Sequence, residues 1–307
     1  MASRASSAGA PPIATDGLSK RYGDTVALAD LDLTVNAGEV YGYLGPNGAG
    51  KTTTIRLLLG LHRPSAGRAS LFGVDAWGEP VRAHGRVAYV AGEPFLWPSL
   101  TGDETLELLA RLRGGADVAY RELLVERFRL DTAKKVRTLS KGNRQKVQLI
   151  AAFASRAGLL LLDEPTAGLD PLMEVAFRQT VVEAKQRGQA VFLSSHILSE
   201  VEALCDRVGI LRDGRLVDEG TLSELRHLGA QTIEVTFDGP PPSLDGIPGA
   251  HVTRAGAHGL HIEASGSLRP LLAALAAQPV VALRSREPSL EEIFLHHYDG
   301  SQAGVGS

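Results

Sequence analysis

The segment GPNGAGKT, residues 45–52, combines three glycines with a lysine and a threonine in the pattern G-x-x-x-x-G-K-[ST]. Glycine takes left-handed backbone conformations at little cost, so such a loop can curl until its amides converge on phosphate oxygens. The lysine of this pattern reaches the β and γ phosphates of a nucleotide, and the next hydroxyl binds Mg2+. We therefore expect a magnesium-nucleotide site containing Gly45, Pro46, Asn47, Gly48, Ala49, Gly50, Lys51, Thr52 and Thr53.

The segment LLLLDEP, residues 159–165, places two acids directly after four leucines. Such a run is typical of a strand buried on both faces of a parallel sheet, and these strands present polar residues at their carboxyl ends, where ligands bind. Asp163 is expected beside the metal, together with Thr52. Glu164 is the candidate general base, because a carboxylate there can polarise the water that attacks the γ phosphate.

The segment LSKGN, residues 139–143, sets a serine and a glycine before the apolar run VQLIAAF. Apolar residues at helical spacing predict a helix over 144–155. Unpaired amides and the positive end of the helix dipole would lie near Ser140 and Gly142, an arrangement that suits an anion.

A frame of alternating strands and helices has to position these segments. VYGYL at 40–44 predicts a strand leading into the glycine loop, and the following helix is expected to carry apolar residues at Ile55, Leu58, Leu59 and Leu61. Asp213-Gly214 between two apolar runs predicts a β-hairpin. The pattern favours an α/β fold.

The composition is that of a globular protein with room for a proper core. Of the 307 residues 44% are hydrophobic, and the formal net charge is -3 with scattered basic residues, which argues against a nucleic-acid partner. No stretch reaches the roughly 20 apolar residues of a membrane span. The single cysteine, Cys205, fits a reducing compartment and is expected to be a buried small side chain. Residues 1–12 lack an apolar signal core and predict a disordered tail, so we expect a cytoplasmic location.

With these motifs in order, residues 13–225 resemble the nucleotide-binding subunit of an ABC transporter. The resemblance implies binding of ATP and Mg2+, with Tyr22 of KRYG stacked on the adenine. It also implies that His196, after the strand AVFLSS, hydrogen-bonds the γ phosphate. Lys51, Glu164 and His196 are thereby the expected catalytic residues.

LSKGN resembles the signature segment of this family, whose usual form is LSGGQ, and retains Ser140 and Gly142. The resemblance implies that this segment meets the ATP bound by a second nucleotide-binding subunit, so that the protein works as a dimer, most simply a homodimer. Asp170, in TAGLD at 166–170, would face that partner. A separate transmembrane permease is the other implied partner, and it would hold the protein at the cytoplasmic face of the membrane.

The implied fold is a P-loop NTPase of ABC type over residues 13–228, a mostly parallel sheet with an antiparallel β subdomain and a helical insert over about 92–156. A small α+β accessory domain is expected over 229–299, followed by a flexible tail at 300–307. TIEVTF, LHIEA and VVALR predict its strands, and SLRPLLAALAA and SLEEIFLHHY predict its helices. We expect no metal site at His251, His258, His261, His296 and His297, because no ligand spacing recurs among them.

One position departs from the family pattern. This chain has Ala91-Gly92 at the position where the family has Pro-Gln. In the family, the glutamine side chain links the metal and the attacking water to the membrane subunit. Glycine has no side chain for that task. In this chain the role is either absent, performed by Glu93, or left to solvent. A carboxylate at position 93 would repel the γ phosphate unless it binds Mg2+.

Two functions fit these motifs. The first is an ATPase subunit that drives a separate permease, with an exporter of the multidrug or antibiotic efflux type favoured by the C-terminal extension. The alternative is a non-transport ABC-type ATPase acting on ribosomes or DNA. About 85 residues separate Lys51 from LSKGN, which is too few for the long coiled-coil insert typical of such clamps.

Overall fold

The computed structural model describes residues 9–155, 157–228, 231–244, 246–264, 266–286 and 289–299. Contacts divide the chain into two compact units, Met1–Glu219 and Gly220–Ser307. The tail predicted at 300–307, most of the tail predicted at 1–12, and the side chains of His296 and His297 lie outside what the structure describes. No helix in the described ranges is both long and apolar enough to cross a bilayer.

A six-stranded sheet forms the centre of the first unit. Its strands are, in spatial order, β10 (Arg215–Thr221), β9 (Arg207–Arg212), β3 (Val40–Leu44), β8 (Ala190–Ser195), β7 (Leu159–Asp163) and β6 (Val87–Val90). The pairings of β3 with β8 and β9, and of β7 with β6 and β8, are parallel. Every residue of β3, β7 and β8 is buried, as expected for parallel strands covered on both faces. The glycine loop, His196 and the Asp163-Glu164 pair therefore lie at the carboxyl ends of β3, β8 and β7, which are neighbours in this sheet, whereas LSKGN precedes α5.

An antiparallel sheet shares a hydrophobic core with the central sheet. Its order is β2 (Thr25–Val35), β1 (Ile13–Tyr22), β4 (Ala66–Leu71) and β5 (Val74–Asp75). The common core contains Leu18 of β1, Ile55 of α1 (Lys51–Leu58) and Phe192 of β8. The short helix α2 (Pro80–His84) packs on β4 and β5. The α1 helix is thus held between the two sheets at the end of the glycine loop.

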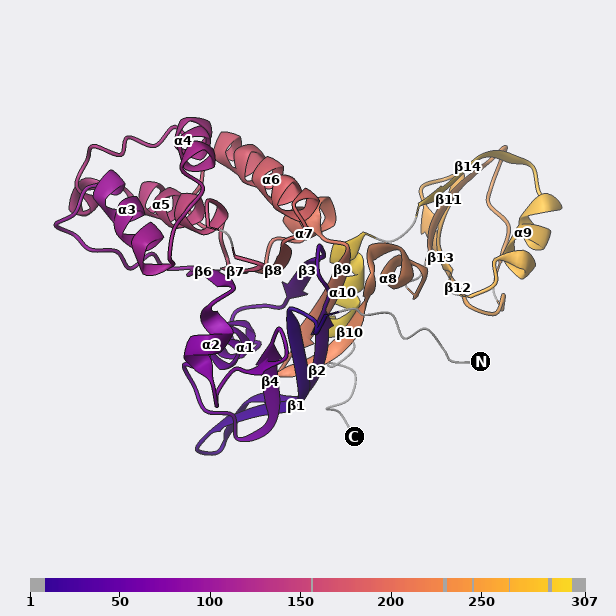
Figure 1. The fold of residues 1–307 in the computed structure, drawn as a ribbon. Coiled ribbons are helices and arrows are strands. Elements are labelled where there is room, and N and C mark those ends of the chain that lie inside the picture. Colours follow the sequence, from indigo (N-terminus) through magenta and orange to yellow (C-terminus); the bar gives the residue numbers. More distant parts are fainter. Residues whose placement is uncertain are drawn as a thin grey trace, which may run out of the picture. The chain divides into compact units, whose positions relative to one another are not determined.

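Helices fill the chain between β6 and β7 (Figure 1). They are α3 (Gly102–Leu112), α4 (Val118–Arg127), the 3-10 turn η1 (Val136–Thr138) and α5 (Lys141–Phe153). A capping box starts α3: Thr101 Oγ1 accepts from the N–H of Glu104, whose carboxylate accepts from the N–H of Thr101. The α5 helix packs against α3 and α4. The helical insert predicted from the sequence is present.

The α5 helix begins at Lys141, three residues before the predicted start at 144. Ser140 Oγ accepts a hydrogen bond from the N–H of Asn143 at 3.2 Å and caps the helix. The signature residues Lys141 and Gly142 therefore belong to the first turn of α5.

The α1 helix ends at Leu58, so the prediction that Leu61 lies on its apolar face is wrong, and Leu61 is exposed. Gly60 turns the chain there with a φ of 57°. A Cβ at this position would lie 2.2 Å from the carbonyl oxygen of Ala76, so only glycine fits the turn.

The strands β9 and β10 are joined by Asp213 and Gly214, both with positive φ, which confirms the predicted hairpin. The remaining helices of the first unit are α6 (Pro171–Gln186), after β7, and α7 (Leu198–Leu204), after β8.

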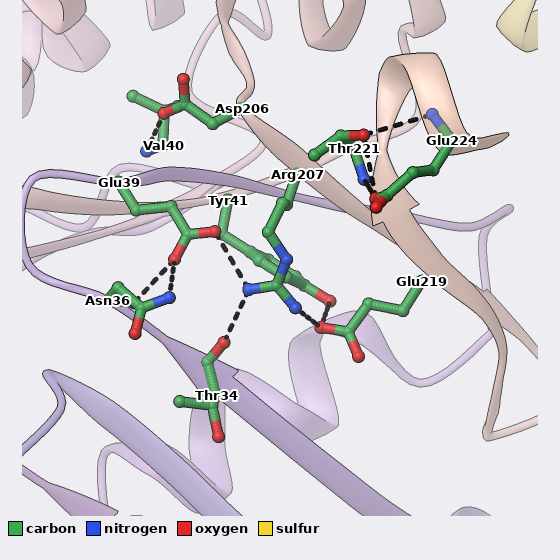
Figure 2. A network of polar contacts seen from close by, with 10 residues as sticks. All are labelled: Thr34, Asn36, Glu39, Val40, Tyr41, Asp206, Arg207, Glu219, Thr221 and Glu224. Carbon is green, nitrogen blue, oxygen red and sulfur yellow. Dashed lines mark hydrogen bonds and ion pairs between the residues drawn. The ribbon is translucent and has the colours of Figure 1, made fainter. Parts of the chain in front are cut away.

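A polar network ties β3, β9 and β10 together (Figure 2). Arg207 donates to Glu39 Oε1 at 3.0 Å and to Glu219 Oε1 at 2.5 Å. The hydroxyl of Tyr41 donates to the same Glu219 oxygen at 3.0 Å, and the guanidinium of Arg207 lies 5.4 Å from the centre of the Tyr41 ring. Burial is the main cause that raises the pKa of Tyr41, and Glu219 adds to it. The network lies at the amino-terminal end of β3, away from the glycine loop.

The second unit holds a four-stranded antiparallel sheet, ordered β12 (Ala250–Ala255), β13 (Gly259–Ala264), β11 (Gln231–Phe237) and β14 (Val280–Arg286). Leu271 and Leu275 of α9 (Arg269–Ala276) pack on its apolar face. The helices α8 (Leu222–Leu228) and α10 (Leu290–Asp299) pack on each other. The predicted α+β character is confirmed. The strand β12 was not predicted, because it is an edge strand whose aliphatic signal is limited to Val252.

Candidate nucleotide site

The loop between β3 and α1 is built on glycines that other residues could not replace. An ideal Cβ at Gly45 would lie 2.7 Å from the carbonyl oxygen of Leu211. One at Gly50, where φ is 113°, would lie 2.6 Å from the carbonyl oxygen of Ala27. Gly48 also has a positive φ, 85°, but no atom lies within 4 Å of its ideal Cβ. The loop is therefore packed tightly on one side and open around Gly48, as a phosphate cradle requires.

The other residues of the loop fix its position. The buried Ala49 donates its N–H to the carbonyl of Pro46 at 3.2 Å, and its own carbonyl accepts from the N–H of Gly214 at 2.9 Å. Asn47 is exposed, and Thr53 is half-buried in the first turn of α1. The first amides of α1 have no acceptor within the helix, so this end of the helix favours an anion.

Lys51 is buried beneath this loop. Its Nζ donates to the carbonyl oxygens of Gly45 at 2.6 Å and Pro46 at 3.1 Å, and lies 3.6 Å from Glu164 Oε1. Burial lowers the pKa of Lys51, and the nearby carboxylates of Glu164 and Asp163 oppose that shift. The two carboxylates thus favour the charged form of the lysine, at the position where phosphate oxygens would lie.

Asp163 is the last residue of β7 and only 5% exposed. Its Oδ1 accepts from Ser194 Oγ at 2.9 Å, and its Oδ2 accepts from Thr52 Oγ1 at 3.3 Å. Burial raises the pKa of Asp163, although the two hydrogen bonds act in the opposite direction. A hydroxyl and a carboxylate side by side form a set of hard oxygen donors, which fits Mg2+.

Glu164 occupies a strained backbone conformation, with a φ of 45°. The carbonyl of Ser194 in β8 accepts a hydrogen bond from its N–H at 2.9 Å. Its Oε1 lies 3.2 Å from Nδ1 of His196, whose side chain is about half exposed. The predicted base and the predicted γ-phosphate ligand are therefore neighbours, presented by adjacent strands. A carboxylate held in this way can accept a proton from water.

The Ala91-Gly92 turn lies against the chain that carries these carboxylates. An ideal Cβ at Gly92 would lie 3.1 Å from the carbonyl oxygen of Asp163 and 3.6 Å from Cβ of Glu164. The next side chain, Glu93, is exposed. Within the described ranges, no group of three or more His, Cys, Asp or Glu side chains is arranged to hold a metal ion.

The signature segment packs on the loop that follows Glu164. A Cβ at Gly142 would lie 2.3 Å from the carbonyl oxygen of Gly168, so the two backbones touch. Asp170 ends that loop and caps α6, with its Oδ1 accepting from the N–H of Met173 at 3.1 Å. The structure thus joins Ser140, Gly142 and the TAGLD loop in one surface. In Figure 1, α5 lies among the helices of the insert and away from α1.

Tyr22 is 44% exposed at the end of β1. Its hydroxyl bonds to Nδ1 of His62, the two rings meet edge to face, and Lys20 Nζ lies 4.8 Å from the centre of the Tyr22 ring. The aromatic face is accessible to a planar ligand, as the adenine assignment requires.

Sequence reasoning missed the groups that support the site. Ser194 holds Asp163, and Gln145 and Gln148 of α5 bond to Ala91. The serine could have been found from its place in the SSH triplet at the end of the predicted strand. The two glutamines gave no signal, because their contacts join segments more than 50 residues apart.

Comparisons with known proteins agree with this geometry. Residues 28–167 match the family described as "ABC transporter". The daunorubicin resistance ATP-binding protein DrrA3 of Streptomyces coeruleorubidus is 37% identical over 306 residues, which cover 92% of this chain and 95% of that protein. The Nod factor export ATP-binding protein I of Burkholderia orbicola (strain AU 1054) is 35% identical over 299 residues, covering 92% of this chain and 96% of that protein.

A solved structure of an ATP-binding subunit of an ABC transporter is also similar. It is 35% identical, with a TM-score of 0.66, and the match covers 70% of this chain and 91% of that one.

Proposed function

The chain belongs to the ABC transporter family of ATP-binding proteins, whose members are ATPases, and from this premise we propose that it hydrolyses ATP to drive a separate membrane permease. One observation carries the proposal. The side chains suited to triphosphate chemistry converge beside the glycine loop from three neighbouring strands, β3, β8 and β7. These side chains are Lys51, Thr52, Asp163, Glu164 and His196.

Each residue has a role that its contacts support. Lys51 leaves its carbonyl partners to bind the β and γ phosphates of ATP. Glu164 accepts the proton of the attacking water, and His196, within reach of the same carboxylate, donates to the γ phosphate. Tyr22 stacks on the adenine. The loop amides around Gly48 cradle the phosphates.

Thr52 and Asp163 would hold Mg2+, because their adjacent oxygens match its preference for hard ligands. When bound, the ion neutralises charge on the β and γ phosphates. Ser194 fixes the Asp163 carboxylate from the other side, so the carboxylate keeps its orientation.

The nucleotide site is completed by a second copy of the chain. Ser140 caps α5, so the first amides of that helix are presented at the Gly142 surface, beside Asp170. This surface would meet the γ phosphate bound in the partner's glycine loop. ATP then holds the two copies together, and hydrolysis releases them.

The permease would dock on a groove between the helical insert and the α1–α2 region. This groove encloses a cavity of about 870 Å³, and exposed apolar side chains line it, including Leu61, Val81 and Leu112. Arg113 lies in it and donates to the carbonyl of Val87 at 2.6 Å. An amphipathic helix with an acidic residue fits this lining, so a cytoplasmic helix of the permease is the proposed occupant.

The relatives favour transport over the alternative of a clamp on ribosomes or DNA, because their names refer to export and drug resistance. We accordingly propose that the transporter exports its substrate and that this substrate is an antibiotic-like molecule. The protein would act at the cytoplasmic face of the membrane, bound to its permease. The C-terminal α+β unit is proposed as an accessory domain of the same subunit.

Replacing Glu164 with Gln tests the proposal in the full-length chain. The variant should keep its affinity for ATP within about twofold and lose hydrolysis by at least about 100-fold, because an amide cannot accept the proton. Glu122→Gln, an exposed residue of α4, is the matched control. Normal turnover by Glu164→Gln would refute the assigned mechanism.

A further inference from the structure

Both backbone polar groups of Ala91 are held by side chains of α5. The N–H of Ala91 donates to Gln148 Oε1 at 3.1 Å, and its carbonyl accepts from Gln145 Nε2 at 3.3 Å. Ala91 directly follows β6, so its amide and carbonyl are not satisfied by the sheet alone. Two glutamines one helical turn apart therefore hold the start of this loop.

Gln145 also reaches a second loop. Its Nε2 donates to the carbonyl of Pro165 at 3.2 Å, and Pro165 directly follows Glu164. Gln145 is completely buried, and its Oε1 has no hydrogen-bond partner among the described residues. A buried amide that leaves its own acceptor unsatisfied is costly. An apolar residue of similar size would avoid that cost. The two hydrogen bonds that Nε2 donates are therefore the reason for a glutamine at this position.

The loop that the glutamines hold is the one packed against the acids. Gly92 follows Ala91, and its ideal Cβ would lie 3.1 Å from the carbonyl of Asp163 and 3.6 Å from Cβ of Glu164. There is little room for a larger residue at this position. Apart from the backbone contact between Gly142 and Gly168, α5 therefore reaches this region through glutamine side chains that bond to the backbone groups of Ala91 and Pro165.

We propose that Gln145 and Gln148 are positioning residues that fasten the Ala91-Gly92 segment and the loop that carries Glu164 to α5, the helix capped by Ser140. A displacement of α5, whose first turn carries Gly142, then moves the loop on which Glu164 lies. This inference rests on the proposed ATPase function and names a route between the signature helix and the base within one chain.

If Gln145 had a purely structural role, its replacement would give a different result from the one that the proposal predicts. A second buried glutamine in the chain provides the comparison. Gln189 is also buried, and its Nε2 donates to the carbonyl of Ala157 at 2.7 Å. That bond joins the segments that precede β7 and β8, at the opposite ends of these strands from Glu164. Gln189→Met removes a buried amide-to-carbonyl bond of the same kind without touching the acids.

The experiment measures kcat for ATP, the dissociation constant of ATP and the thermal unfolding temperature in the full-length chain. Gln145→Met should lower kcat by about tenfold, because a base displaced by a fraction of an ångström aligns water poorly. Its dissociation constant for ATP should stay within about twofold of the wild type. Gln189→Met should lower the unfolding temperature comparably and leave kcat within about twofold.

Gln148 supplies a second, milder variant, because its side chain is only partly buried. Gln148→Leu removes the acceptor for the N–H of Ala91 and should lower kcat, whereas Gln148→Glu keeps an acceptor oxygen and should recover most of the rate. If the wild type is active and both Gln145→Met and Gln148→Leu turn over ATP at its rate, the inference is wrong while the ATPase assignment stands. An equal loss of kcat in Gln189→Met would also overturn it. If the wild-type chain hydrolyses no ATP, the proposed function fails and the inference fails with it.

Discussion

His196 Nδ1 lies 3.2 Å from Glu164 Oε1, and the two residues come from the loops that follow β8 and β7. Lys51 Nζ lies 3.6 Å from the same oxygen. Because β7 pairs in parallel with β8 over the whole length of β7, the spacing of these side chains is set by the register of the sheet. The base is thereby placed between the lysine of the glycine loop and the histidine.

Replacing His196 with Ala should lower kcat by about 100-fold, because the proposed hydrogen-bond donor to the γ phosphate and the imidazole next to Glu164 are both lost. Affinity for ATP should change little, since the glycine loop and Lys51 remain. Steady-state hydrolysis at saturating ATP measures the effect. His251→Ala, an exposed histidine of the second unit, is the control. Wild-type turnover in the His196 variant would remove the residue from the mechanism.

Asp163→Asn should stabilise the nucleotide-free protein. Burial raises the pKa of Asp163, so the folded protein binds a proton there more readily than the unfolded chain. Stability is consequently lost as the pH rises from the ordinary range of an aspartate through the raised pKa. The asparagine avoids this loss, and we expect a gain of about 1 kcal/mol at neutral pH.

Urea unfolding between pH 4 and 8 checks this expectation. The advantage of Asp163→Asn should shrink as the pH falls, because the protonated aspartate is then neutral as well. Asp24→Asn, at an exposed turn, is the control. A variant that is less stable at neutral pH, or whose gain is independent of pH, contradicts the argument.

Arg207→Met should destabilise the first unit by about 2 kcal/mol, because Glu39, almost fully buried, loses its cationic partner. The loss should be smaller when Glu39→Gln is already present, since the two residues act as a pair. Equilibrium unfolding in urea provides the free energies. ATP affinity should be unaffected, because the network lies at the other end of β3 from the glycine loop. A change below about 0.5 kcal/mol would mean that the network does not stabilise the fold.

Leu112→Asp should abolish stimulation of ATP hydrolysis by the permease. Leu112 ends α3, its side chain is 68% exposed in the groove, and a carboxylate there opposes docking of the apolar face of an amphipathic helix. Copurification with the permease and the stimulated rate are the measurements. Leu272→Asp, at an exposed position of α9, is the control. Full stimulation of the Leu112 variant would place the permease elsewhere.

The motifs were predictable from the sequence because each is local. A glycine loop, an acid pair after four leucines and a serine that opens a helix depend on residues within one short segment. The strands that lead into the glycine loop and the acid pair are fully buried and consist mainly of apolar residues, so they could be predicted. The start of α5 was misplaced, because the cap at Ser140 acts before the apolar pattern begins.

The supports of the site could not be predicted, because they depend on register and packing between distant segments. Nothing near Gln145 in the sequence indicates that its amide bridges Ala91 and Pro165. The strained φ of Glu164 likewise follows from the contacts of its loop and not from its neighbours. The edge strand β12 was missed because its exposed side chains lack a pattern.

The central claim is that two copies of the chain must combine their half-sites around one ATP before it is hydrolysed. The rate of hydrolysis per chain, measured while the full-length protein is diluted at saturating ATP, tests it most directly. We predict that the rate per chain falls as dimers dissociate, and that Ser140→Arg, which keeps its ATP affinity, stays inactive at every concentration. A rate per chain that remains constant and high down to concentrations where the protein is monomeric would contradict the account.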